Sequence, residues 1–259
     1  MEDDKPKTMQ RMIAILDCFS GDQPELGVRE IARQIGFSRS TTGRLLQAMK
    51  DLNLLQQNPN TLAYSLGGKV LAWAGIYLSH LDVRDVALPA IRELHELSHE
   101  TVSLYVLEGN ERVCVERLES TQNVRVVARV GRRIPLYAGS AGKVFLAYLP
   151  LERCKAILRE TPPQAITEFT ITDRKKLMDE LEKIRQQGYA TSYGEWVADA
   201  AGVSAPVLGS RGEIIAVVTI SGPIARFTPE VMEARTKDIL RLAASISHEM
   251  GYSGKDSVF

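Results

Sequence analysis

The stretch GVREIARQIGFSRSTTGRLLQAMKDLNLL, residues 27–55, decides the fold of the first part of this chain. It predicts a short helix over residues 28–35, a turn at Gly36 and a longer helix over residues 39–52. Ala32 is small where two helices must cross closely, and the following glycine permits a sharp turn. This spacing is typical of a helix-turn-helix.

The second helix of this stretch has two different sides. Ser38 is a good N-cap, Thr42 points back toward the first helix, and Leu45, Leu46, Met49 and Leu52 form an inner stripe. The outer side is polar and has no acid among Arg39, Ser40, Thr41, Gly43, Arg44 and Gln47. Because arginine can donate two hydrogen bonds to guanine and hydroxyls can reach bases or phosphates, we expect this side to enter the major groove of DNA.

Gly43 is an unusual residue for the middle of a helix, where it costs about 1 kcal/mol relative to alanine. A close approach to DNA or to a neighbouring helix would explain it. After the second helix, two short apolar runs flank Asn58-Pro59-Asn60, which predicts a β-hairpin and hence a winged variant of the motif. The predicted DNA-binding residues are Arg29, Ser38, Arg39, Ser40, Thr41, Gly43, Arg44, Gln47, Asn58 and Asn60.

Composition sets the limits for any partner. The 259 residues have a formal net charge of zero, so nucleic-acid binding must come from a local patch. Cys18, Cys114 and Cys154 are widely spaced and odd in number, which argues against a disulfide framework and fits a reducing cytoplasm. The longest mostly apolar stretch, residues 70–81, is too short to span a bilayer, and we expect no membrane partner.

The rest of the chain predicts an α+β architecture. Helical periodicity covers residues 8–19, with Met9, Met12, Ile13, Leu16 and Phe19 on one face, and also 68–81, 82–100, 140–149, 173–187 and 228–250. Alternating or β-branched runs predict strands at 101–109, 112–119 and 124–130, and again in YATSYG, GVSAPVLG and EIIAVVTISG. We therefore predict a winged helix-turn-helix domain at 1–67, a linker helix at 68–82 and an α+β domain at 83–259. The linker helix is more apolar than a free linker allows, so we expect it to pack against a partner subunit through Val70, Leu71, Trp73, Ala74 and Tyr77.

The segment YAGSAGK, residues 137–143, predicts a second site. Small residues open a helix there, so the N–H groups of Ser140, Ala141 and Gly142 offer a seat for a carboxylate. In the strand VVTISG, alternation places Thr219 and Ser221 on one face. The alternative is plain tight packing, with the hydroxyls bonded to backbone.

Three segments carry a resemblance to a known family: residues 26–74, LGVREIARQIGFSRSTTGRLLQAMKDLNLLQQNPNTLAYSLGGKVLAWA, with 130–149, VGRRIPLYAGSAGKVFLAYL, and 188–228, GYATSYGEWVADAAGVSAPVLGSRGEIIAVVTISGPIARFT. In this order the chain resembles the IclR family of bacterial transcriptional regulators over residues 8–250. The resemblance implies a winged-helix head, a linker helix and a GAF-like effector domain with a curved antiparallel sheet flanked by helices. It also implies dimers or dimers of dimers on palindromic double-stranded operators near catabolic genes, modulated by a small metabolite, with no enzymatic activity and no cofactor.

The resemblance also implies effector-binding positions. Family members that bind small acids use the positions matching Ser140, Ala141, Thr219 and Ser221, with an acid and a cysteine in the segment matching TSYGEWVADAAGV. This chain departs there, because Ser192 and Tyr193 stand where the family often has acids and Gly202 stands where some members have cysteine. The predicted effector-binding residues are Ser140, Ala141, Gly142, Tyr193, Gly202, Thr219 and Ser221. With Trp196 and Tyr193 as an aromatic wall, we expect an organic acid larger than three carbons, sugar-derived or aromatic.

Two rival interpretations stay open at the level of sequence. HELSH, residues 95–99, matches the zinc-protease motif H-E-x-x-H, although Arg92 on the same stripe would repel a cation and favours plain surface histidines. A hydrolase or metal-dependent enzyme would use this motif or the Ser140 region and keep the head as an interaction module. In the other rival, the second domain only oligomerises. We expect no catalytic or metal-binding residue, and Lys143 is interpreted as packing or a surface charge.

Overall fold

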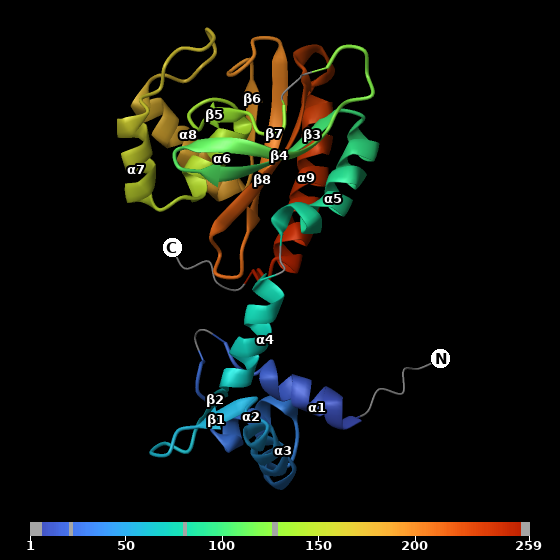
Figure 1. The fold of residues 1–259 in the computed structure, drawn as a ribbon, viewed down its shortest axis with the longest axis vertical. Helices are drawn as coiled ribbons and strands as arrows, with labels where there is room; N and C mark the ends of the chain where they lie inside the picture. Colours follow the sequence, from blue (N-terminus) through green and yellow to red (C-terminus); the bar gives the residue numbers. More distant parts are fainter. Residues whose placement is uncertain (1–6, 21–22, 80–81, 126–128, 255–259) are drawn as a thin grey trace. The chain divides into compact units, whose positions relative to one another are not determined.

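The computed structural model describes residues 7–20, 23–79, 82–125 and 129–254 (Figure 1). The chain divides into two compact units, residues 1–81 and residues 82–259. The first unit contains α1 (Lys7–Leu16), α2 (Val28–Ile35), α3 (Arg39–Asp51), β1 (Leu55–Gln57), β2 (Tyr64–Leu66) and α4 (Gly68–Ser79).

The first unit is a winged helix-turn-helix, as predicted. Gly36 caps the end of α2 in the left-handed conformation with φ 71°, and α3 begins three residues later at Arg39. Ser38 caps α3, because its hydroxyl accepts a hydrogen bond from the backbone N–H of Thr41. Strands β1 and β2 pair antiparallel, with Leu55 opposite Leu66, and form the wing.

The core of the first unit corrects two details of the prediction. Ile15 of α1 is fully buried, whereas Met9 and Ile13 are exposed, because the inward stripe of this helix runs through Met12, Ile15 and Leu16. Leu52 is also exposed, since α3 ends at Asp51 and its stripe ends one turn earlier. The described buried apolar residues of this unit are Ile15, Leu26, Ile31, Ala32, Leu46, Met49, Leu54, Leu55 and Tyr64.

Helix α4 was predicted to pack against a partner subunit through its apolar residues. Leu71 and Trp73 are 75% and 52% exposed, and the Lys69 ammonium lies 5.4 Å from the centre of the Trp73 ring. The predicted contact residues Ala74 and Tyr77 have side chains outside the described set. The subunit contact stays a prediction. Among the described residues, no helix is long and apolar enough to cross a membrane.

The second unit is built on one antiparallel sheet. Its described strands are β3 (Thr101–Glu108), β4 (Glu111–Leu118), β5 (Arg133–Pro135), β6 (Ala190–Tyr193), β7 (Ala200–Leu208) and β8 (Ile214–Pro223). They follow the order β5-β4-β3-β8-β7-β6, so the N-terminal strands β3 and β4 and the C-terminal strands β7 and β8 meet at the β3–β8 pair. The sequence predicted β3, β4, β7 and β8 as strands, but it did not predict which of them pair. The central β3–β8 pair joins residues more than a hundred positions apart in the chain.

Helices cover both faces of the sheet. On one face lie α5 (Val83–Ser98) and α9 (Pro229–Glu249), and on the other lie α6 (Ser140–Tyr148), α7 (Leu151–Glu160) and α8 (Arg174–Gln187) (Figure 1). Alternation along β8 divides its side chains between the two, with Val218 and Ile220 toward α5 and α9 and Val217 toward α6. Each face therefore has its own apolar core.

The predicted strand at 124–130 falls partly outside the described residues. Residues 126–128 lie outside the described residues, and the described residues on either side are not in a strand. Among the described strands, β5 forms the edge of the sheet beside β4, with the buried Ile134 opposite Arg112.

Candidate functional site

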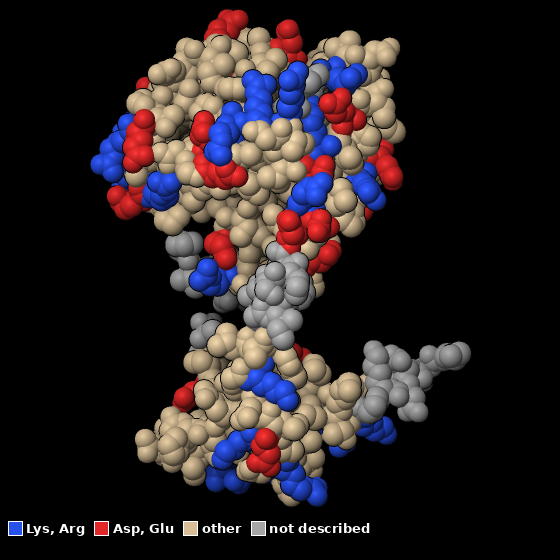
Figure 2. Space-filling model, viewed as in Figure 1, with Lys and Arg blue, Asp and Glu red and all other residues tan. Residues whose placement is uncertain are grey.

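The polar side of α3 is exposed to solvent in the first unit. Arg39, Ser40, Arg44 and Gln47 are exposed, and Thr42 on the opposite side is fully buried. Figure 2 shows Lys and Arg side chains around the end of this unit where α2 and α3 lie. Arg29 of α2 is exposed as well. The N-terminal half of α3 therefore exposes two arginines, Arg39 and Arg44, that could reach into a DNA groove.

Some of the predicted DNA-binding side chains are already engaged within the unit. The Ser38 hydroxyl donates to Thr41 Oγ1 at 2.9 Å, and Gln47 Nε2 donates to Asp51 Oδ1 at 2.8 Å. In the wing, Asn58 Oδ1 accepts from the backbone N–H groups of Asn60 and Thr61 and so shapes the turn. Arg39, Ser40 and Arg44 have the fewest such restraints on the helix, and Asn60 presents the exposed tip of the wing.

Gly43 has open space where a side chain would be. A Cβ built at this position meets no atom within 4 Å among the described residues, and Gly43 has an ordinary helical backbone. Crowding by a neighbouring helix of the same unit therefore does not explain the glycine. Close approach of DNA at Gly43 stays a prediction.

We expect Gly43→Ala to have opposite effects on stability and on DNA binding. The variant should raise the free energy of unfolding of the first unit by up to about 1 kcal/mol, because alanine is the better helix former and nothing obstructs its methyl group. It should weaken DNA binding, because the methyl group would lie between α3 and the groove. Urea unfolding and a DNA titration on the same preparation measure both, and unchanged DNA affinity would contradict the predicted approach.

The second unit contains a pocket between the sheet, the N-terminal end of α6 and the loop after β6. The cavity proper has room of about 70 Å³ for the centres of water-sized groups, and about 610 Å³ when all the space up to the open solvent at its mouth is counted. The described lining residues are Tyr105, Arg112, Arg117, Arg132, Ile134, Gly139, Ser140, Ala141, Ser192, Trp196, Val197, Ala200, Ala201, Gly202, Thr219 and Ser221. Predicted positions Ser140, Ala141, Gly202, Thr219 and Ser221 thus come together, although 81 residues of chain separate the first from the last.

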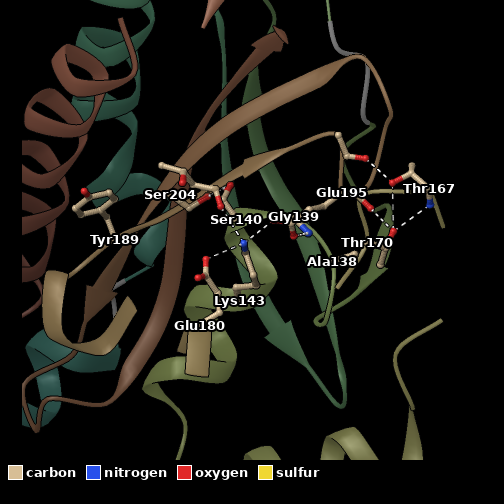
Figure 3. A network of polar contacts seen from close by, with 12 residues as sticks. Ala138, Gly139, Ser140, Lys143, Thr167, Thr170, Glu180, Tyr189, Glu195 and Ser204 are labelled. Atoms are coloured by element: carbon tan, nitrogen blue, oxygen red, sulfur yellow. Dashed lines mark hydrogen bonds and ion pairs between the residues drawn. The ribbon is translucent and has the colours of Figure 1, made fainter. Parts of the chain in front are cut away.

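Hydroxyl groups join α6 to the sheet beside this pocket (Figure 3). Ser204 of β7 donates to Ser140 Oγ at 2.7 Å and shares a hydrogen bond of 2.8 Å with Thr219 Oγ1 of β8. Ser204 lies opposite Thr219 in the register, so both hydroxyls point to the same face. The hydroxyls of Ser140, Ser204 and Thr219 bond to one another, from α6, β7 and β8. The alternative, in which such hydroxyls bond to the backbone, does not hold for these three residues.

Two predicted effector-binding residues, Gly142 and Tyr193, do not line the pocket. Gly142 lies in the packed underside of α6, where an added Cβ would be 2.2 Å from Leu136 O and 2.3 Å from Arg112 Nη1. Tyr193 is 42% exposed, and its neighbour Ser192 lines the pocket instead. Ser192 pairs with Gly202 across the β6–β7 ladder, and directly paired residues face the same side. Because side chains alternate along β6, Ser192 faces the pocket and its neighbour Tyr193 faces the other side of the sheet.

Lys143 is a buried structural cation and not a surface charge (Figure 3). Its Nζ donates to Glu195 Oε1 at 2.5 Å, to Glu180 Oε1 at 3.3 Å and to the carbonyl oxygen of Thr191 at 2.9 Å. Glu195 Oε2 accepts from the N–H of Gly139, the N-cap of α6, at 3.0 Å. Glu195 therefore fixes the start of α6, and neither Glu195 nor Asp199, the other acid of the 191–203 segment, is among the described lining residues.

Three arginines of the pocket were not predicted from the sequence. Arg112 and Arg117 lie on β4, and Arg132 directly precedes β5. Figure 2 shows a concentration of Lys and Arg side chains over this side of the second unit, where β4 and β5 lie. The sequence RVCVERLE predicted a strand. Arg112 and Arg117 are five positions apart, so in a regular strand their side chains would lie on opposite faces of the sheet.

A β-bulge brings the two arginines of β4 to the same face. The register passes from Tyr105 opposite Cys114 to Leu104 opposite Glu116, so Val115 is an extra residue. Beyond the bulge, Arg117 lies opposite Ser103 and lines the pocket. Its neighbour Glu116 faces the other side, where it forms a 2.7 Å ion pair with Arg84 of α5.

Arg112 is the most buried charge of the pocket, with 4% of its surface exposed. Its Nη1 donates to Ala138 O at 2.7 Å and to Pro135 O at 3.2 Å, and its guanidinium carbon lies 5.5 Å from the centre of the Tyr105 ring. Its Nε has no hydrogen-bond partner among the described residues. Burial lowers the pKa of Arg112 to about 10, with Arg132 adding to the lowering.

The HELSH segment does not form a metal site in the described structure. His95 Nε2 lies 2.7 Å from the carbonyl oxygen of Glu119, and His99 ends α5 in the left-handed conformation with φ 54°. Within the described residues, no group of three or more His, Cys, Asp or Glu side chains is placed to hold a metal ion.

Comparison with known proteins covers both units. The model of the IclR helix-turn-helix domain matches residues 8–59, and the model of the bacterial transcriptional regulator IclR C-terminal region matches residues 75–248. The chain is 33% identical to the HTH-type transcriptional regulator KipR of Bacillus subtilis over 249 residues, which is 96% of this chain and 99% of KipR.

Two solved structures extend the comparison. Pseudomonas aeruginosa HmgR superposes with a TM-score of 0.82 at 28% identity, covering 96% of this chain and 100% of HmgR. An IclR homologue from Microbacterium hydrocarbonoxydans, in complex with 4-hydroxybenzoate, superposes with a TM-score of 0.59 at 26% identity, covering 94% of this chain and 99% of that one.

Proposed function

Because this chain belongs to the IclR family of bacterial transcriptional regulators, and is a DNA-binding regulator and not an enzyme, we propose that an organic acid controls its binding to DNA. The DNA is a palindromic operator near catabolic genes, bound by a dimer or a dimer of dimers in the cytoplasm. The acid occupies the pocket of the second unit. Binding of the acid favours one arrangement of the heads over another and so changes operator affinity by a coupling free energy, typically about 1–3 kcal/mol.

The observation that carries this proposal is the buried, positively charged pocket. Arg112 is 4% exposed, and its Nε has no hydrogen-bond partner among the described residues. Burying such a group costs free energy unless a ligand accepts a hydrogen bond from it. A second unit that only oligomerised would have no use for such a group beside a helix N-terminus and a set of hydroxyls. The pocket therefore favours a ligand-responsive regulator over that rival. The relative bound to 4-hydroxybenzoate supports an aromatic acid as one candidate.

The DNA-binding half of the proposal rests on α3. Arg39 and Arg44 are exposed on its outer side, and together they add the charge and the bidentate donors that a base-reading helix needs. The surrounding charge is modest, since residues 5–66 carry eight Lys and Arg against five acids. Affinity per head should accordingly be modest and should increase when two heads bind one operator.

We expect Arg39→Ala and Arg44→Ala each to weaken operator binding by about 1–3 kcal/mol, or roughly 5- to 150-fold, because each removes a bidentate base contact. Fluorescence-anisotropy titration at fixed salt is the measurement, with DNA from the region upstream of the gene and a scrambled duplex as the competitor. Arg211→Ala is the matched control, because that side chain is 87% exposed at the β7–β8 turn of the second unit. If all three variants bind like the parent, α3 is not the recognition helix.

A further inference from the structure

We propose that the effector carries two acidic groups, and that the pocket holds them at two separate cationic positions. This inference deepens the proposed function and rests on it. It starts from charge: the described lining includes Arg112, Arg117 and Arg132 and has no Asp or Glu side chain. Glu195 lies nearby, but its carboxylate is already paired with Lys143 and Gly139.

The first position lies at the N-terminal end of α6. Arg112 is packed against the first turn of this helix, because a Cβ added at Gly139 would lie 3.3 Å from Arg112 Nη2. Arg132 is close enough to lower the pKa of Arg112. The unpartnered Nε of Arg112, the helix N-terminus and the second guanidinium therefore define one site for an anionic group.

The second position is formed by Arg117 on the sheet. Arg117, Ser103 and Thr219 occupy one row across β4, β3 and β8, as successive partners in the register. That row spans two strand spacings, which are about 4.8 Å each. Arg112 lies on the other side of the bulge, opposite Leu107, which is four residues along β3 from Ser103. The two guanidinium groups thus serve different parts of the pocket.

Charge balance then selects the ligand. The described lining presents three guanidinium groups and no carboxylate in a partly enclosed site, so a second acidic group on the ligand has a second guanidinium group to bind. The lining also has an aromatic and apolar part, with Tyr105, Ile134 and Trp196, and the Arg132 guanidinium lies 5.3 Å from the centre of the Trp196 ring. A flat or flexible body with acidic groups at its two ends fits this arrangement.

The test compares acids that differ only by one acidic group. Isothermal titration of the full-length protein uses terephthalate against benzoate, glutarate against butyrate, and 3-phosphoglycerate against glycerate. We expect at least one diacid to bind about tenfold or more tightly than its partner. The first two pairs report on dicarboxylates and the third on a carboxylate combined with a phosphate, so they separate the two sources of a second acidic group.

Variants locate the second group. Arg117→Gln should reduce the affinity for the preferred diacid about tenfold and leave its monoacid partner within about twofold, so that the preference disappears. Arg211→Gln, outside the pocket, should leave both affinities unchanged. Equal binding of diacid and monoacid in every pair, absence of binding by every diacid, or an equal loss for both acids in Arg117→Gln would overturn the inference.

The operator titration keeps this inference separate from the proposed function. If the protein binds diacids through Arg117 but does not bind its upstream DNA specifically, the inferred ligand class holds and the proposed regulatory function is wrong. If the protein binds its operator specifically and only a monoacid changes that binding, the proposed regulatory function holds and the inferred ligand class is wrong.

Discussion

Lys143→Met is expected to lower the free energy of unfolding of the second unit by about 3–5 kcal/mol, the usual cost of removing one partner of a buried ion pair. The Lys143 and Glu195 side chains are only 2% and 7% exposed, and their atoms are 2.5 Å apart. Methionine fills the volume but leaves the Glu195 carboxylate without its cation. Urea unfolding followed by Trp196 fluorescence in a Trp73→Phe background measures this unit alone, since the chain has two tryptophans.

Two further variants show whether the cost comes from the lost pairing. Adding Glu195→Gln to Lys143→Met should recover a large part of the loss, because the glutamine keeps an acceptor for the Gly139 N–H and carries no charge. Lys155→Met is the surface control: its ion pair with Glu152 is exposed, so the change should be within about 1 kcal/mol. An equal loss in the Lys143 and Lys155 variants would show that the buried pair has no special role.

Gly142→Ala is the second change with a large expected effect. The new methyl group would lie 2.2 Å from the carbonyl oxygen of Leu136, which is backbone and cannot rotate away, and 2.3 Å from Arg112 Nη1. Either α6 shifts or the loop before it moves, and overpacking of this kind costs about 1–3 kcal/mol or more. Displacement of Arg112 from Ala138 and Pro135 should also disturb the pocket.

Gly43→Ala is the matched control for this prediction, because it adds the same methyl group in a helix with open space around it. We expect the Gly142 variant to lose stability in the second unit and to bind its effector more weakly, while the Gly43 variant keeps both properties. Calorimetric unfolding together with isothermal titration distinguishes the two. Unchanged unfolding of Gly142→Ala would mean that the close contact with Leu136 is not maintained in solution.

The sequence by itself determined the features that depend on neighbours in the chain. The left-handed Gly36, the Ser38 cap and the buried Thr42 depend on residues a few positions apart, so local spacing alone is enough to predict the helix-turn-helix. The same holds for Thr219 and Ser221, which share a face because side chains alternate along a strand. The family resemblance added the roles that such patterns alone do not specify.

Only the tertiary structure decided the charge and shape of the pocket. Arg117 faces the pocket because a bulge at Val115 reverses its parity, and Arg132 arrives there because β5 pairs at the edge beside β4. The burial of Lys143 depends on Glu195, 52 residues away, and the exclusion of Tyr193 depends on the register of β6 against β7. These features come from pairing between distant segments, and the local periodicity of a sequence does not encode which distant segment a strand will meet.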